Sequence, residues 1–157
     1  MTELKGVSWL KQLDTHVAGD DSTGVLRVTK VTFDPTGNTA QRPIAAYAVG
    51  SFIPANAIVV GGFFDVNTLF TSAGGNAGTV AIMVEGAADI QTAAAVSGAP
   101  YSTIGRKAII PKANTPESTS VKVGAAQKQI TFTVATQNLT AGKLTLYLYW
   151  LEGVASA

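Results

Sequence analysis

Hydrophobic and polar residues alternate with a period of two along much of the C-terminal third of this chain. In 130–135, isoleucine, phenylalanine and valine are separated by threonines, and in 143–152 every second residue from Leu144 to Trp150 is apolar. Strands with one buried face have this pattern, because successive side chains point to opposite sides of a sheet. We therefore predict two strands here and expect them to pair as a hairpin across the turn residues between them.

A second pair of strands is predicted upstream. The residues 57–70 are rich in β-branched and aromatic side chains, and 79–84 has the same two-residue period. Between them the small residues 72–78 tolerate positive φ, which predicts a hairpin loop. Gly61 and Gly62 interrupt the longer strand, and we expect a bulge or sharp bend there, where the strand could pass from one sheet to another.

The N-terminal strand needs an irregularity to bury its apolar residues. Leu26 and Val28 share one face of this strand, whereas Val31 and Phe33 share the other, and a bulge near Thr29 and Lys30 would absorb the shift. The strand is expected to end in a turn, and further short strands are predicted beyond it. The turn is 34–38, and the short strands are 44–49, 108–110 and 120–123.

One internal segment has the pattern of a helix. Asp89 is a suitable N-cap for 90–96, and Ser97 and Gly98 follow as stop signals. The first thirteen residues have apolar side chains at helical spacing and predict a short amphipathic helix or an extended arm. We therefore divide the chain into an N-terminal arm or short helix, 1–24, and a single β-domain, 25–157.

The spacing of the strands indicates the fold class. Short strands separated by turn residues are typical of antiparallel all-β folds, and 157 residues suffice for one sizeable core. We predict an all-β protein, an antiparallel β-sandwich or jelly-roll-like barrel with one short connecting helix and an N-terminal arm.

Charged residues are scarce and balanced in sign. Asp, Glu, Lys and Arg make up 13% of the chain, roughly half of the ~25% usual in soluble domains. A surface this neutral suits a protein that is covered by copies of itself or by a partner. The formal net charge is +1 and the basic residues are scattered, so nothing indicates binding to nucleic acid.

The sequence also bears on compartment and membrane contact. There is no cysteine, which excludes disulfides and thiolate chemistry within this chain. The first thirteen residues contain charged side chains and lack the apolar core of a secretion signal. The longest strongly apolar run, 58–64, is far shorter than the ~20 residues of a membrane-spanning helix. We expect a soluble protein made in the cytoplasm, with no membrane contact.

Candidate catalytic residues are few. His16 is the single histidine and lies among three aspartates, a pattern that favours a polar loop over a metal site because no second histidine is present. Asp65, Glu85 and Asp89 lack the spacing of a diagnostic carboxylate pair. The glycine-rich 74–78 lacks the Gly-Lys-Ser/Thr ending of a phosphate-binding loop. We predict no enzymatic activity, no cofactor and no bound metal.

Several segments between Tyr47 and Glu152 form a recurrent pattern that covers most of the chain. They are the Ile-Pro-Ala-Asn-Ala-Ile-Val-Val run at 53–60, the segments 65–68, 70–72 and 80–85, the small helix expected at Asp89, and the closing run 139–149. This pattern resembles the structural β-domains of tailed-phage virions, and most of all the capsid decoration, or cement, proteins. Related β-domains occur in head fibres and tail appendages.

The resemblance implies a structural role on the outer capsid surface of a virion. Decoration proteins of this kind bind the shell as trimers and clamp neighbouring capsomers, so the implied partners are two further copies of this chain and the major capsid protein. The alternative is a receptor- or carbohydrate-binding module of a head fibre or tail appendage. The residues expected at an interface are Trp9, Leu10 and Leu13 from the arm, and Tyr147 and Tyr149 from the last strand.

Overall fold

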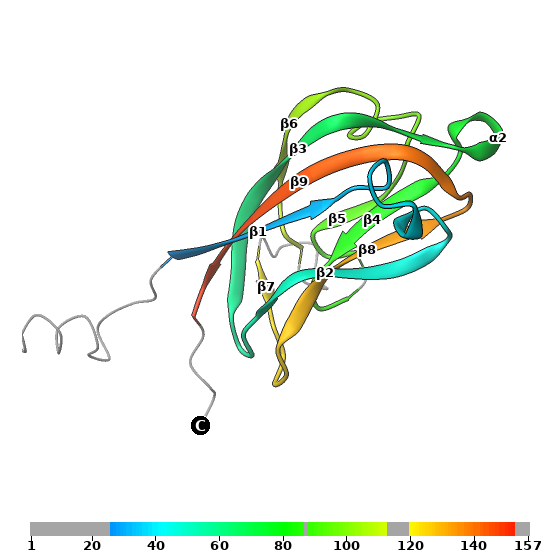
Figure 1. Ribbon diagram of the computed structural model, residues 1–157. Helices are drawn as coiled ribbons and strands as arrows, with labels where there is room; N and C mark the ends of the chain where they lie inside the picture. Colours follow the sequence, from blue (N-terminus) through cyan, green and yellow to red (C-terminus); the bar gives the residue numbers. More distant parts are fainter. Residues whose placement is uncertain (1–25, 87, 113–119, 153–157) are drawn as a thin grey trace, which may run out of the picture.

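The chain forms two facing antiparallel β-sheets (Figure 1). The computed structural model describes residues 26–86, 88–112 and 120–152. Sheet A has the strand order β1-β9-β3-β6, with β7 also paired to β3, and sheet B has the order β2-β8-β4-β5. The predicted antiparallel sandwich is thereby confirmed. The bounds are β1 Leu26–Phe33, η1 Thr39–Gln41, β2 Ala45–Ile53, β3 Ile58–Ser72, α2 Ala73–Asn76, β4 Thr79–Met83, β5 Gln91–Ala95, β6 Gly105–Ile109, β7 Val121–Lys122, β8 Lys128–Ala135 and β9 Leu139–Leu151.

One hydrophobic core fills the space between the sheets. Phe33 of β1 stacks on Phe132 of β8, with ring centroids 4.7 Å apart and an interplanar angle of 3°. Phe70 of β3 lies 6.2 Å from Phe33, centroid to centroid. Tyr101, fully buried, donates its hydroxyl to the carbonyl of Val80 at 3.1 Å, and burial raises its pKa. Each such buried aromatic contributes about 2–3 kcal/mol through burial of apolar area.

The predicted alternation is present in β8 and β9. In both strands every second side chain is buried between the sheets, while the intervening ones are mostly half-buried on the outer face. The outer positions of β9 include Tyr147 and Tyr149, whose neighbours Leu146 and Leu148 are fully buried. The period of two therefore fixes which side chains of β9 remain available on the surface.

The two glycines of β3 produce the expected bulge. The register between β3 and β9 shifts between Val59 and Gly61. Gly62 has a φ of +152°, and a Cβ atom there would collide with the carbonyl oxygen of Tyr147, so glycine is required at this position. However, β3 pairs with β9 from Ile58 to Ser72. The expectation that the strand changes sheets at the bulge was wrong.

Both predicted hairpins were wrong. β8 lies in sheet B and β9 in sheet A, and the same separation divides β4 from β3. Facing sheets are about 10 Å apart, and the chain crosses from β8 to β9 through the three-residue turn 136–138, in which Thr136 has a φ of +69°. A short polar turn can connect two strands of one hairpin or two strands of different sheets. The alternation of apolar residues predicts which face of a strand is buried, but it does not predict which strand pairs with it.

The predicted bulge in β1 was also wrong. β1 pairs with β9 without a shift from Leu26↔Leu151 to Phe33↔Leu144. Thr29 turns inward because, in a strand without a bulge, it shares the face of the buried Val31 and Phe33. Leu26 and Val28 point outward and are 56% and 55% exposed. The hydroxyl of Thr29 accepts a hydrogen bond from the indole Nε1 of Trp150 at 2.8 Å, which supplies the acceptor that a buried indole N–H requires.

The predicted helix at 90–96 was wrong, since this segment contains strand β5. β5 pairs with the edge of β4 and satisfies backbone groups that an alanine-rich helix would have left open. Asp89 caps a turn and not a helix, because its carboxylate accepts hydrogen bonds from the backbone N–H groups of Val84, Glu85 and Gly86. The four residues of α2 lie within 72–78, where a loop was expected, and Gly74, Gly75 and Asn76 have the positive φ predicted for that loop.

The remaining predictions hold with shifted ends or are untested. The segments 44–49, 108–110 and 120–123 overlap β2, β6 and β7. In the turn 34–38, the N–H of Asn38 donates to the carbonyl of Asp34 at 2.8 Å. The predicted arm, 1–24, lies outside the described residues. None of the helices in the described part of the chain is long and apolar enough to cross a membrane.

Candidate functional site

Four side chains form a row across the outer face of sheet A. Lys30 of β1, Tyr147 of β9 and Phe63 of β3 occupy paired register positions, and Arg106 reaches over from β6. The rings of Tyr147 and Phe63 stack with centroids 4.8 Å apart and an interplanar angle of 23°. The Cζ of Arg106 lies 4.1 Å from the centroid of Phe63, and the Nζ of Lys30 lies 5.6 Å from that of Tyr147. We call these four residues the aromatic row.

The order of the strands determines what the aromatic row exposes. Since β9 and β3 lie between β1 and β6, each ring has the other ring on one face and a cation on the opposite face. Such stacking and cation–π contacts stabilise the arrangement and restrict the rotamers of all four side chains. The ring faces are thus occupied, and the ring edges and polar ends are left toward solvent.

An ion pair holds Arg106 in position. Its Nε and one terminal nitrogen donate to the two carboxylate oxygens of Asp65 at 3.1 and 3.2 Å. This bidentate hydrogen bonding raises the pKa of Arg106, so the guanidinium stays charged. The Arg106 side chain is 66% exposed and that of Asp65 26%. The arginine therefore presents a charge of fixed orientation to solvent.

Exposed apolar side chains extend the aromatic row toward one end of sheet A. Tyr149 lies edge-on to Phe63, with centroids 6.1 Å apart and an interplanar angle of 67°. Val28 is opposite Tyr149 in the β1–β9 register, and Leu26 occupies the next outward position. Outward positions do not need apolar residues for folding, and a contiguous apolar patch of this kind is typical of an interaction surface.

The polar ends of this surface lack intramolecular partners. Within the described residues, Lys30 has no carboxylate partner, and the hydroxyls of Tyr147 and Tyr149 form no hydrogen bond. By contrast, the nearby Thr145 hydroxyl donates to the side-chain oxygen of Asn67 at 2.9 Å. One ammonium and two hydroxyl groups are consequently free to bind a partner.

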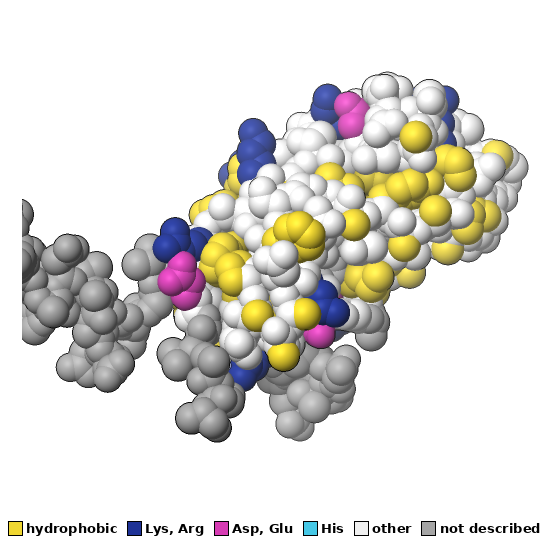
Figure 2. Space-filling view, turned by 60° about the horizontal axis from the view of Figure 1, so that its bottom comes forward, with side chains coloured by type: hydrophobic (Ala, Val, Ile, Leu, Met, Phe, Trp, Pro, Cys, Tyr) yellow, Lys and Arg dark blue, Asp and Glu magenta, His cyan; other side chains and the backbone are white. Residues whose placement is uncertain are grey.

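The outer face of sheet B is different in chemistry. Its outward side chains are uncharged and mostly small, as in the paired rows Ala46–Thr133–Ala81 and Ala48–Thr131–Met83. An exception is Phe52 of β2, which is 51% exposed. Within the four strands of this sheet as described, Lys128 at the start of β8 is the one charged residue. Figure 2, which brings forward the side where β2 and β8 lie, shows wide areas without charged side chains.

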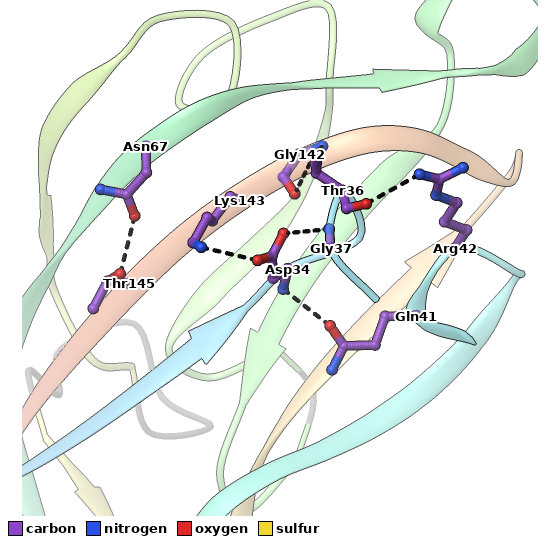
Figure 3. A network of polar contacts seen from close by, with 9 residues as sticks. All are labelled: Asp34, Thr36, Gly37, Gln41, Arg42, Asn67, Gly142, Lys143 and Thr145. Atoms are coloured by element: carbon purple, nitrogen blue, oxygen red, sulfur yellow. Dashed lines mark hydrogen bonds and ion pairs between the residues drawn. The ribbon is translucent and has the colours of Figure 1, made fainter. Parts of the chain in front are cut away.

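A polar network fixes the far end of the β1–β9 pair (Figure 3). The carboxylate of Asp34 accepts a hydrogen bond from the N–H of Gly37 at 2.8 Å and lies 2.9 Å from the Nζ of Lys143. The hydrogen bond from Gly37 is the largest cause of the lowered pKa of Asp34, and the hydrogen bond with Lys143 is the second. The N–H of Gly142 donates to the Thr36 hydroxyl at 2.9 Å. The donors and acceptors named here bind one another, so we interpret the network as a contact that holds this end of the strand pair together.

The carboxylates considered as catalytic candidates are engaged in structural contacts. Asp65 binds Arg106, the buried Asp89 caps its turn, and Glu85 accepts the N–H of Gly124 and pairs with Lys128. In the part of the chain that the structure describes, no cluster of His, Cys, Asp or Glu is placed to hold a metal ion. His16 lies outside that part.

Comparisons with known proteins bear on the fold. No family model and no curated protein sequence matches this chain. Among solved structures, a chain of the cyanophage Pam1 capsid asymmetric unit is similar, with a TM-score of 0.59 and 17% identity over 85% of this chain and 90% of that one. A chain of the acidic stable capsid structure of Helicobacter pylori bacteriophage KHP30 has a TM-score of 0.55 and 12% identity, covering 83% and 90%. Chains of two phage capsid structures share this fold.

The surface contains part of the predicted interface and residues that the sequence did not single out. Tyr147 and Tyr149 lie together on the outer face of sheet A, whereas Trp9, Leu10 and Leu13 lie outside the described residues. Three residues were missed: Lys30, Phe63 and Arg106. An outward aromatic in a long strand and two isolated cations are weak signals, because only the strand order brings them to the two tyrosines.

Proposed function

We propose that this protein is a structural component of a phage virion, which binds the outer surface of the shell as a homo-oligomer, a trimer, and stabilises it. The observation that carries the proposal is the fold match to chains of two phage capsid structures. Each match covers 90% of the other chain and more than four fifths of this one. The matched chains therefore have nearly the length of this protein and no large additional domain.

The surface chemistry supports attachment to other proteins. Only 13% of the residues are charged, and the outer face of sheet A carries half-buried tyrosines beside the exposed apolar Leu26 and Val28. Protein interfaces are enriched in tyrosine and arginine and depleted of most other charged residues. Many copies on one lattice reinforce weak individual contacts through avidity. We propose Tyr147 and Tyr149, together with Trp9, Leu10 and Leu13, as interface residues.

The same chemistry supports a role without catalysis. Each candidate carboxylate of the described residues has a structural partner. The alternative function, a receptor- or carbohydrate-binding module, would use tyrosine rings as stacking platforms for sugars. Both faces of Tyr147 and Phe63 are already covered by neighbours, which favours the decoration role over sugar binding.

The test combines solution mass with binding to shells. We expect the purified full chain to have the mass of a trimer in light scattering and to co-sediment with phage shells from which the native copies have been stripped. A monomer that does not sediment with shells but binds glycans on an array would contradict the proposal and support the receptor-binding alternative.

A deletion separates the two groups of proposed interface residues. Removing 1–13 is expected to weaken sedimentation with shells while leaving the far-UV circular dichroism and the urea midpoint of the β-domain unchanged. If the deletion instead abolishes cooperative unfolding, this segment belongs to the core of the domain and is not a binding arm.

A further inference from the structure

We infer that the outer face of sheet A binds a protein surface rich in carboxylates, with Lys30 and Arg106 as charged contacts on either side of a rigid aromatic centre. The inference rests on the proposed function only in identifying the phage shell as the source of that surface. Beyond the proposed function, we assign the chemical class of the partner and the residues that would contact it.

The charges on the outer face of sheet A favour an acidic partner. The charged groups that belong to the outer face around the aromatic row are Lys30, the Asp65–Arg106 pair and Lys143, which is paired with Asp34. Once these ion pairs are formed, Lys30 is the one charge of the aromatic row without a counter-charge among the described residues. Among the paired groups, the Arg106 side chain is the most exposed, at 66%. A partner with carboxylates would complement this field.

The same charges disfavour self-association through this face. In a two-fold symmetric contact, the same patch meets itself, so Lys30 would approach the aromatic row of a second copy that carries the same cations. Like charges brought together at an interface oppose association. The face therefore suits a different partner better than a two-fold contact with another copy of this chain, whereas the contacts of a trimer join different patches and are not affected.

The side chains of the aromatic row are preorganised for binding. Lysine, arginine and tyrosine side chains lose conformational entropy when a partner immobilises them. Here Arg106 is fixed by Asp65 and by Phe63, and Tyr147 is fixed by Phe63 and Lys30 before any partner arrives. Much of the ordering is complete in the free protein, which favours affinity at a small contact area.

Three polar groups on this face have no acceptor among the described residues. The ammonium of Lys30 and the hydroxyls of Tyr147 and Tyr149 are hydrogen-bond donors without an acceptor in the described residues. Carboxylates are acceptors only and form the stronger, charge-assisted hydrogen bonds with such donors. A neutral polysaccharide would offer hydroxyls in place of charge and would need the ring faces that the aromatic row has already occupied.

The experiment measures binding of the full chain to fluorescent poly-L-glutamate, with dextran as the neutral polysaccharide. Lys30→Glu is compared with Lys128→Glu, which makes the same change in net charge on sheet B. We expect Lys30→Glu to lower the affinity for poly-L-glutamate about tenfold and Lys128→Glu to lower it less than about twofold, since long-range effects are screened at ordinary salt. Equal losses in both variants, or none, would overturn the inference. Binding to dextran that Lys30→Glu leaves unchanged would replace it with a glycan site.

A second variant guards against a folding artefact. Tyr147→Phe keeps the ring and removes only the hydroxyl, so its thermal unfolding is expected to match that of the native protein while its affinity for poly-L-glutamate falls about threefold. An unchanged affinity would show that the hydroxyl is no part of the site and would contradict the donor argument.

Stripped phage shells separate this inference from the proposed function. If the native chain binds poly-L-glutamate through Lys30 but does not sediment with shells, the proposed function fails and the acidic partner must be sought elsewhere. If native chain and Lys30→Glu sediment with shells equally well, the proposed function stands and the inference fails.

Discussion

The two sheets of this protein bury the same kind of inner face and expose two different outer ones. Toward the core, both present phenylalanine, isoleucine and valine, and Phe33 from sheet A stacks on Phe132 from sheet B. Toward solvent, sheet A carries stacked aromatics with fixed cations, whereas sheet B carries mostly alanine and threonine, with Met83 and a single exposed phenylalanine, Phe52, in its described strands.

This difference shows which positions the fold constrains. Packing at close to crystal density restricts the inner face, where any change of volume is felt. The outer positions of a strand tolerate most polar or small residues, as sheet B shows. Sheet A departs from that pattern at Lys30, Phe63, Tyr147 and Arg106. These side chains stabilise the sheet through their mutual contacts, and under the proposed function they also contact a partner.

The largest expected effect on stability is in the core between the two sheets. Phe132→Ala removes a fully buried ring that stacks on Phe33, and we expect the free energy of unfolding to fall by about 3–5 kcal/mol. Urea unfolding followed by tryptophan fluorescence measures this change. A loss below about 1 kcal/mol would mean that the two inner faces do not form one core.

The next effect concerns the bend of sheet A. Gly62→Ala is expected to destabilise by about 2–3 kcal/mol, because the new Cβ collides with the carbonyl oxygen of Tyr147 and φ is +152°. Gly61→Ala is the matched control, since a Cβ there meets nothing within 4 Å, and we expect a change within about 1 kcal/mol. Equal effects in thermal unfolding would show that the bulge is not set by this glycine.

A smaller effect compares the outer faces directly. Tyr147→Ala is expected to cost about 1–2 kcal/mol, because it removes the stack with Phe63 and the contact with Lys30. Thr131→Ala, at an outward position of sheet B, is expected to stay within about 0.5 kcal/mol. A double-mutant cycle with Phe63→Ala isolates the coupling. Zero coupling would contradict the view that the aromatic row is ordered in the free protein.

The smallest effect is a dependence on pH at the end of the β1–β9 pair. The hydrogen bond from Gly37 and the contact with Lys143 lower the pKa of Asp34 in the folded state. Ionised Asp34 therefore stabilises the fold above its unfolded pKa of 3.8, and this contribution is lost as pH falls through the folded value. Asp34→Asn should reduce stability at pH 7 by about 1 kcal/mol or less, since the carboxylate is partly exposed. Its unfolding midpoint should then fall less between pH 5 and pH 2 than that of the native protein. Identical pH profiles would contradict this role.

The sequence predicted the layers of the fold better than its connections. Alternation in 130–135 and 143–152 identified β8, β9 and their buried faces, because burial acts on each strand separately. The partners of those strands depend on the whole arrangement, so both hairpins were wrong. The alanine-rich 91–95 became a strand because the open edge of β4 outweighs a helix propensity of a few tenths of a kcal/mol per residue.

The candidate site was predictable only in part, for the same reason. Tyr147 and Tyr149 were evident as aromatics on the outward phase of one strand. Lys30 and Arg106 come from strands that are distant in sequence, and each reaches a ring only through the order β1-β9-β3-β6. Thr29 illustrates the limit on the inner face, where a polar residue is buried opposite one indole N–H, whose partner strand the sequence did not reveal.

The pairing of Leu26 with Leu151 also has a mechanical consequence. The first and last described strands are antiparallel neighbours whose outer ends meet at the same point of sheet A. A force that pulls these two ends apart acts on one pair of hydrogen bonds at a time. β1 would therefore separate from β9 by unzipping, at a low unfolding force. A force applied along the strands, for example between Leu26 and the α2 loop, would load many hydrogen bonds together in shear. The force needed to unfold this domain thus depends on the residues through which the force is applied.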